Sequence, residues 1–101
     1  MSDIPRLSAV ELRDAFAAGE VSATEAVRAY LDAIESQGPN IGAFTQVFND
    51  RALQRAEEID RSRRRREPTG PLAGVVLAVK DNMTTDYGRT TCASKLLEEF
   101  R

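Results

Sequence analysis

Residues 74–85 read GVVLAVKDNMTT, and here an unbroken apolar run meets polar side chains with no turn residue between them. The run covers positions 75–79 and is mostly β-branched. A short run that is apolar on both faces is typical of a strand buried inside an α/β sheet. We therefore expect a buried strand over 75–79, with Lys80, Asp81 and Asn82 at its carboxyl end.

Two expected helix starts upstream share the same sequence pattern. Ser8 is followed three residues later by Glu11, and Ser22 by Glu25. Each pair predicts a capping box, in which a hydroxyl and a carboxylate bond backbone N–H groups reciprocally. The second helix also has an apolar face at 3–4 spacing, formed by Ala23, Val27, Tyr30, Leu31 and Ile34.

Helix ends follow from glycine and proline. Gly19 is expected to end the first helix and Gly38 the second, with Pro39 preventing continuation. Asp50 can cap a third helix over residues 51–65. The residues expected to face inward from this third helix are Leu53, Ala56 and Ile59.

The remaining segments are shorter. Residues 41–48, IGAFTQVF, predict a short strand or extended segment, and residues 67–74, EPTGPLAG, a turn-rich connector. Residues 82–91 predict a loop around Gly88, and residues 94–101 the opening of another helix. The predicted fold class is α/β, with a mixed sheet covered by helices.

Two features of this pattern, the buried strand and the last helix, predict an incomplete domain. A strand buried on both faces needs neighbours on either side. The last helix begins an apolar face with Leu96, Leu97 and Phe100 that the sequence does not continue. We therefore expect residues 1–101 to be the N-terminal part of a larger domain.

Composition excludes several classes of site. The chain has 101 residues, 42% of them apolar and 30% charged, as in soluble globular proteins, and no apolar run is near the roughly 20 residues of a membrane span. Without histidine it cannot form a Ser-His-Asp or Cys-His site, and with one cysteine a zinc site is not expected. The single Cys92 cannot form an internal disulfide, which suits the reducing cytoplasm.

The net charge of −2 conceals a basic tract made of Arg61 and the arginines at positions 63–66. The favoured interpretation is a solvated helix end, where cations complement the negative pole of the helix. The alternative is a non-catalytic module whose arginine tract binds nucleic acid. No aromatic residue is interleaved with the arginines to stack on bases, which favours the first interpretation.

Residues 70–100, GPLAGVVLAVKDNMTTDYGRTTCASKLLEEF, resemble the N-terminal region of the amidase signature family. The matching elements are GPLAG, the apolar run, KDN, and the loop leading to TTCAS. The last element is most similar to the branch formed by the A subunits of tRNA-dependent amidotransferases. The general amidases of the same family, which act on small amides, are the alternative.

This resemblance implies acyl transfer by a Ser–cis-Ser–Lys triad, and the lysine of KDN matches Lys80. No stretch in the chain resembles the family's glycine- and serine-rich motif, so no serine is assigned and the chain alone is expected to be inactive. An exposed lysine is protonated at neutral pH, whereas desolvation disfavours the charged form and frees a lone pair for proton relay. We expect the apolar run to supply that desolvation.

The resemblance also implies a set of partners. Glutamine would be the substrate, and its ammonia would pass to a B subunit that uses ATP and Mg²⁺ to activate a tRNA-bound carboxylate. A small C subunit would join the complex. The resemblance implies no cofactor or metal in this chain, and no membrane.

Other polar residues have simpler roles. Asp81 and Asn82 are expected to hold the following loop through local hydrogen bonds. Cys92 could be a nucleophile of nitrilase type, but a small buried apolar residue is the favoured interpretation. Ser94 is expected to be a helix N-cap.

Overall fold

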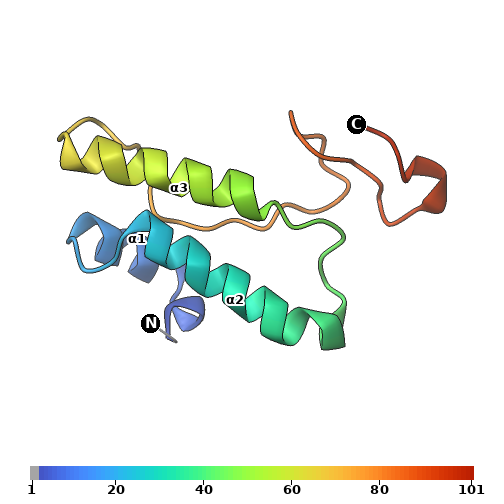
Figure 1. Ribbon diagram of the computed structural model, residues 1–101, viewed down its shortest axis with the longest axis horizontal. Coiled ribbons are helices and arrows are strands. Elements are labelled where there is room, and N and C mark those ends of the chain that lie inside the picture. Colours follow the sequence, from blue (N-terminus) through green and yellow to red (C-terminus); the bar gives the residue numbers. More distant parts are fainter. Residues whose placement is uncertain (1–2) are drawn as a thin grey trace.

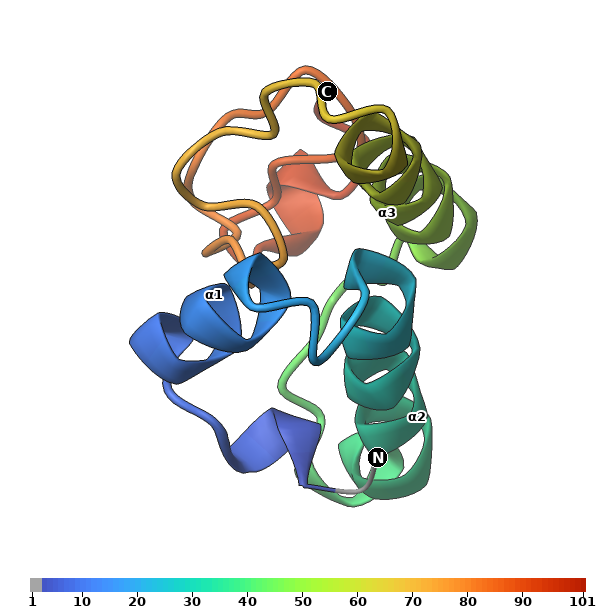
Figure 2. The same ribbon diagram turned by 90° about the vertical axis from the view of Figure 1, so that its left-hand side faces the viewer.

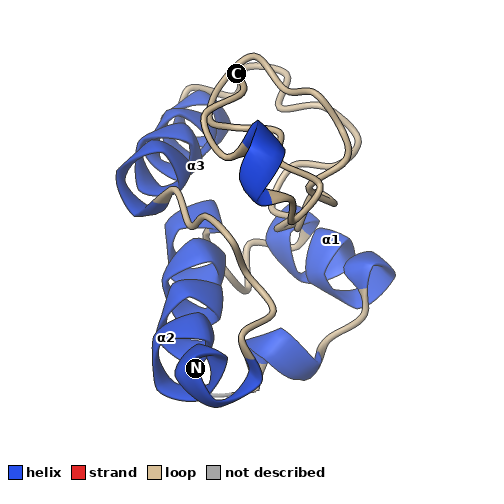
Figure 3. Cartoon of the chain, turned by 90° about the vertical axis from the view of Figure 1, so that its right-hand side faces the viewer, coloured by secondary structure: helices blue, strands red, loops and turns tan. Residues whose placement is uncertain are grey.

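The computed structural model describes residues 3–101, and in this range it consists of helices, turns and irregular segments (Figure 3). In chain order the helices are η1 (Ile4–Arg6), α1 (Ala9–Ala17), α2 (Ala23–Ile41), α3 (Asn49–Arg64) and η2 (Lys95–Leu97). Figures 1 and 2 show α2 and α3 as an antiparallel pair, with α1 beside the start of α2. The short helix η1 packs against α2.

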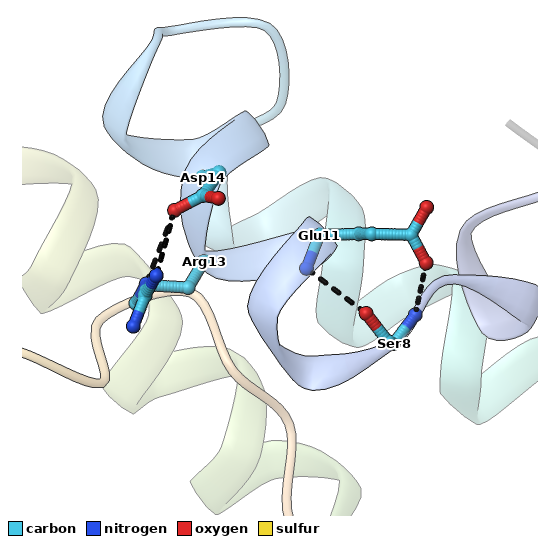
Figure 4. Close-up of polar contacts among 4 residues, drawn as sticks. All are labelled: Ser8, Glu11, Arg13 and Asp14. Atoms are coloured by element: carbon cyan, nitrogen blue, oxygen red, sulfur yellow. Dashed lines mark hydrogen bonds and ion pairs between the residues drawn. The ribbon is translucent and has the colours of Figure 1, made fainter.

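The first predicted capping box is confirmed at α1 (Figure 4). The Glu11 N–H donates to Ser8 Oγ at 3.1 Å, and the Ser8 N–H donates to Glu11 Oε1 at 3.0 Å. The hydrogen bond from the Ser8 N–H, and after it the Ser8 hydroxyl, favours the ionised form of the Glu11 carboxyl and lowers its pKa. The predicted end is also confirmed: Gly19 has φ +78°, and the Glu20 N–H donates to Ala15 O in a Schellman pattern.

The helix α2 begins as predicted and ends later than predicted. Ser22 and Glu25 form the second capping box, but the helix continues through Gly38 and Pro39. Proline in the last turn removes one intrahelical N–H bond, and the helix ends soon afterwards without further loss. Gly42, at φ +67°, is the left-handed C-cap, and its N–H donates to Gly38 O at 2.6 Å.

The helix α3 begins one residue before the predicted cap. Asp50 lies in the first turn instead of capping it, because Phe48 occupies the N-cap position with no side-chain hydrogen bond. The predicted inward face is confirmed, with Ala56 buried and Leu53 and Ile59 half-buried.

Two side chains of α3 hold the junction between α1 and α2. The Asp60 carboxylate accepts hydrogen bonds from the Ala23 N–H at 2.8 Å and from the N–H and hydroxyl of Thr24 at 3.0 and 2.7 Å. The Arg63 guanidinium donates to Phe16 O and to Val21 O, and its Cζ lies 4.1 Å from the centre of the Phe16 ring. One helix thus satisfies N–H groups that begin α2, a carbonyl at the end of α1 and a carbonyl of the turn between them.

The buried core is small. Its members come from η1, α1, the turn before α2, the start of α2, α3 and the segment after α3, and they are Ile4, Leu12, Phe16, Val21, Ala23, Ala26, Ala56 and Ala73. Half of these residues are alanines, so the helices approach closely but bury little apolar surface.

The predicted α/β class and mixed sheet are not observed: among residues 3–101 neither predicted strand forms. Residues 75–79 are irregular, with Leu77 71% and Val79 49% exposed. In the segment 41–48, Ile41 belongs to α2 and most of the rest is irregular. A strand needs a partner to bond its backbone groups, and neither segment has one within the described range.

The C-terminal segments follow the predicted pattern in part. The loop around Gly88 is confirmed, with φ +72° at the glycine. Ser94 is confirmed as an N-cap, because its Oγ accepts from the Leu96 N–H at 3.3 Å, but the helix it starts is only the single turn η2. From Asp3 onward, no helix combines the length and apolar character that crossing a bilayer requires.

Candidate functional site

The GPLAG segment sets the path of the chain toward Lys80. Gly74 has φ +87°, a conformation that side chains with a Cβ rarely adopt. A Cβ at this position would also lie 2.6 Å from the Cβ of Phe16, on α1. The last glycine of the motif therefore lets the backbone pass directly against α1 before it reaches residues 75–80.

A groove of about 730 Å³ lies between α2, α3 and the segment that contains Lys80. We call it the α2–α3 groove. Its lining is mostly apolar and includes Val27, Tyr30, Ile59, Val76 and Lys80. The groove brings the predicted catalytic residue beside a surface formed by both long helices.

The environment of Lys80 differs from the expected one. Lys80 is exposed, as are Leu77 and Val79 from the apolar run before it. Across residues 3–101, no carboxylate lies within ion-pair distance of its ammonium group. The expected desolvation is therefore absent here, because the run forms no buried strand. The proton-relay role of Lys80 stays a prediction.

Asp81 holds the loop after Lys80, as predicted. Its Oδ1 accepts from the Thr91 N–H at 3.0 Å, and its Oδ2 accepts from the hydroxyls of Thr91 and Thr45, the latter at 3.3 Å. These bonds, the one from the Thr91 N–H foremost, lower the pKa of the Asp81 carboxyl. The Cys92 N–H also donates to Asp81 O at 2.9 Å, so the loop is closed at both its main chain and its side chain.

Of the other polar candidates, Cys92 is more exposed than predicted. Asn82 is exposed, and Cys92 is exposed with φ +52°, so the predicted burial of the cysteine is wrong. Its N–H is bonded to Asp81 in a left-handed turn, which directs the backbone inward and leaves the side chain outside. In the described part of the chain, no three His, Cys, Asp or Glu side chains could together hold a metal ion.

Sequence reasoning missed the contacts between the α2–α3 connection and the loop after Lys80. Gln46 Nε2 donates to Arg89 O at 2.8 Å, and the Arg89 N–H donates to Gln46 Oε1 at 3.0 Å. The rings of Phe48 and Tyr87 meet edge to face, 5.0 Å between centroids. A Cβ on Gly88 would collide with the Phe48 ring. The alternating pattern of residues 41–48 indicated that this segment contacts another one. The contacts are made by side chains, however, and not by backbone pairing in a sheet.

The arginine tract divides into two groups. Arg63 is half-buried and bonds carbonyls, as described above, whereas Arg61, Arg64, Arg65 and Arg66 are exposed at the end of α3. In the range 3–101 none of these four lies within 4 Å of a carboxylate. A solvated helix end therefore describes four of the five arginines and not Arg63.

Comparison with known proteins identifies relatives over nearly the whole chain. The sequence profile of the Amidase family matches residues 25–101. The A subunit of the glutamyl-tRNA(Gln) amidotransferase from Thermobifida fusca is 49% identical over 101 residues, which are 100% of this chain and 20% of the relative. The A subunit of the same name from Acidothermus cellulolyticus is 50% identical over 98 residues, 97% of this chain and 19% of the relative.

A third relative, the glutamyl-tRNA(Gln) amidotransferase A subunit from Chlamydia felis, is 44% identical over 95 residues, 94% of this chain and 19% of the relative. The chain thus spans about a fifth of the length of the curated relatives it matches. No solved structure matches the chain.

Proposed function

Because the chain belongs to the Amidase family, we propose that it is a section of a glutamine-hydrolysing A subunit of a tRNA-dependent amidotransferase. One observation supports this more than any other: eight relatives with that subunit name are 38–50% identical over 87–100% of the chain. The general amidases of the family are the less specific alternative.

In this proposal Lys80 relays the proton of the attacking serine and then returns it to the ammonia that leaves. Acyl transfer from an amide needs both steps, first a base and then an acid. The two serines would come from outside residues 1–101, since each serine in this chain stands alone in sequence. The same outside parts would have to cover Leu77, Val79 and Lys80, because a lysine relays protons only when its neutral form is accessible.

The proposed partners follow from the proposed subunit. The ammonia released from glutamine would be used by a B subunit, which would hold ATP and Mg²⁺, to amidate a carboxylate on tRNA, and a C subunit would complete the complex in the cytoplasm. This chain would hold neither cofactor.

The first test is glutamine hydrolysis by the whole protein that carries this chain. Lys80→Ala is expected to lower kcat by about 10²–10⁴-fold, the usual contribution of a general acid–base group. Release of ammonia from glutamine is the measurement. The matched control is Lys95→Ala, which removes an exposed lysine at the start of η2 and should leave the rate unchanged.

Two outcomes would contradict the proposal. Full activity of Lys80→Ala would remove Lys80 from the reaction. A kcat/KM for a small aliphatic amide well above that for glutamine would instead favour the general amidases. The 101-residue chain by itself is expected to release no ammonia from either compound.

A further inference from the structure

Asp81 is placed next to Lys80, but both of its carboxylate oxygens accept hydrogen bonds from other residues. Oδ1 accepts the Thr91 N–H at 3.0 Å, and Oδ2 accepts two hydroxyls, those of Thr91 and Thr45. A carboxylate whose oxygens both accept strong donors is a poor acceptor for a substrate proton. Asp81 is therefore suited to hold neighbouring groups and not to exchange protons with a substrate.

These hydrogen bonds join two points that are ten residues apart in the sequence. The main chain makes a second link between the same two segments, because the Cys92 N–H donates to Asp81 O at 2.9 Å. On the other side, the Met83 N–H donates to Lys80 O at 3.0 Å and closes a tight turn. The carbonyls of both Lys80 and Asp81 are thus fixed, and the direction in which the Lys80 side chain leaves the backbone is set by them.

The Thr91 side of this connection is itself held firmly. Thr91 is 8% exposed, its Oγ accepts from the Ala93 N–H at 3.2 Å, and its carbonyl accepts from the Ser94 N–H at 2.8 Å. Thr45 brings in the connection between α2 and α3. Asp81 therefore links the backbone beside Lys80 to a buried residue and to the helical body.

We propose that Asp81 is a positioning residue that fixes Lys80 through its bonds to Thr91. This inference rests on the proposed function, in which Lys80 relays protons. A lysine side chain is long and flexible, and its amine can serve a reacting serine only if its backbone is held in place. A displacement of about 1 Å at a reacting group can cost about 10²-fold in rate.

The test uses the whole protein and changes Thr91, so that the charge beside Lys80 is kept. Thr91→Val removes the hydroxyl donor at nearly constant volume, and it is expected to lower kcat about 10–100-fold with little change in KM. Thr91→Ser keeps the hydroxyl and should restore most of the rate. Thr84→Val, the same change at an exposed position of the same loop, is the matched control and should have no effect.

A pH–rate profile separates positioning from a loss of folded protein. Partial unfolding would lower the rate equally at every pH, and KM and the shape of the profile would not change. If Lys80 is displaced, the pH at which the rate changes because Lys80 titrates should also shift. Lys80→Ala identifies that part of the profile, because it removes it. Asp81→Asn should shift the same part of the profile, because an amide accepts the Thr91 N–H less strongly than a carboxylate does.

Hydrogen exchange at the Thr91 and Cys92 amides keeps the two proposals distinguishable. Faster exchange of both amides in Asp81→Asn would show that Asp81 holds the segment at Thr91 and Cys92. This result does not depend on which reaction the protein catalyses. If Lys80→Ala stays active, the proposed function fails. If Lys80→Ala is inactive while Thr91→Val and Asp81→Asn keep the normal kcat and pH–rate profile, only the positioning role of Asp81 is overturned.

Discussion

At the scale of single residues, two helices end in the same hydrogen-bonding pattern with different residues at the left-handed position. After α1 this position is Gly19, at φ +78°, and after α3 it is Arg66, at φ +59°. The Glu67 N–H donates to Ser62 O just as the Glu20 N–H donates to Ala15 O. Arginine is unfavourable there because its Cβ crowds the backbone, whereas glycine has no Cβ.

Arg66→Gly is therefore expected to stabilise the chain by about 1 kcal/mol. Urea unfolding followed by circular dichroism would measure the change. The control is Arg61→Gly, which removes an exposed arginine from inside α3 and should destabilise by about 1 kcal/mol, because glycine is a poor residue in a helix interior. Equal effects of the two changes would contradict the left-handed cap at Arg66.

At the scale of elements, α3 stabilises the turn between α1 and α2 through hydrogen bonds made by two of its side chains. Asp60 is 6% exposed, and burial alone would raise the pKa of its carboxyl. The hydrogen bonds from Thr24 and Ala23, together with the charge of Arg63, outweigh burial and lower that pKa instead. The ionised carboxylate thus acts as a second cap for α2, supplied from 36 residues farther along the chain.

The lowered pKa of Asp60 predicts how stability depends on pH. A carboxyl with a lower pKa in the folded state stabilises the fold above its unfolded pKa, about 3.9, and that stability is lost as the pH falls through the folded value. Asp60→Asn should lower the free energy of unfolding at pH 7 by about 1–3 kcal/mol. Below about pH 4, the free energy of unfolding of this variant should fall less steeply with pH than that of the unchanged chain.

Asp14→Asn is the matched control for this change. Asp14 is exposed, and within residues 3–101 its side chain pairs only with the neighbouring Arg13, an interaction that contributes little to stability. Thermal unfolding of both variants at pH 7 and at pH 3 measures the effect. An unchanged stability of Asp60→Asn at pH 7 would show that the carboxylate is not capping α2.

At the scale of the whole molecule, much apolar surface is left uncovered. The large apolar side chains that are exposed include Phe44, Leu72, Leu77, Met83, Leu96 and Phe100. Exposed apolar side chains in this number are candidates for contact with another surface. The chain therefore folds around a small alanine-rich core, and large apolar residues of the C-terminal half lie outside that core, namely Leu72, Leu77, Met83, Leu96 and Phe100.

This surface predicts that the isolated chain binds an environment-sensitive dye such as ANS. Leu77→Ser should lower the dye fluorescence and leave the unfolding temperature nearly unchanged, since Leu77 is 71% exposed. Val76→Ser is the neighbouring control: Val76 packs against the core, so this change should lower the unfolding temperature. The reverse ranking of the two variants would place Leu77 in the core.

By itself, the sequence determined the local features. The capping boxes at Ser8 and Ser22, the end of α1 at Gly19, and the hydrogen bonds of Asp81 to its loop were all predictable. They depend on residues a few positions apart, or on the strong preference of a carboxylate for nearby N–H groups. The resemblance around Lys80 likewise indicated the family without any knowledge of the fold.

Only the tertiary structure decided the long-range features. The capping of α2 by Asp60, the contact of Gln46 with Arg89 and the exposure of Lys80 depend on residues brought together from distant positions. An apolar run such as 75–79 shows that it can be buried, but a strand forms only where another segment bonds its backbone. Within residues 3–101 no segment does so, and the physical reason is that β-structure, unlike a helix, cannot satisfy its own N–H and C=O groups.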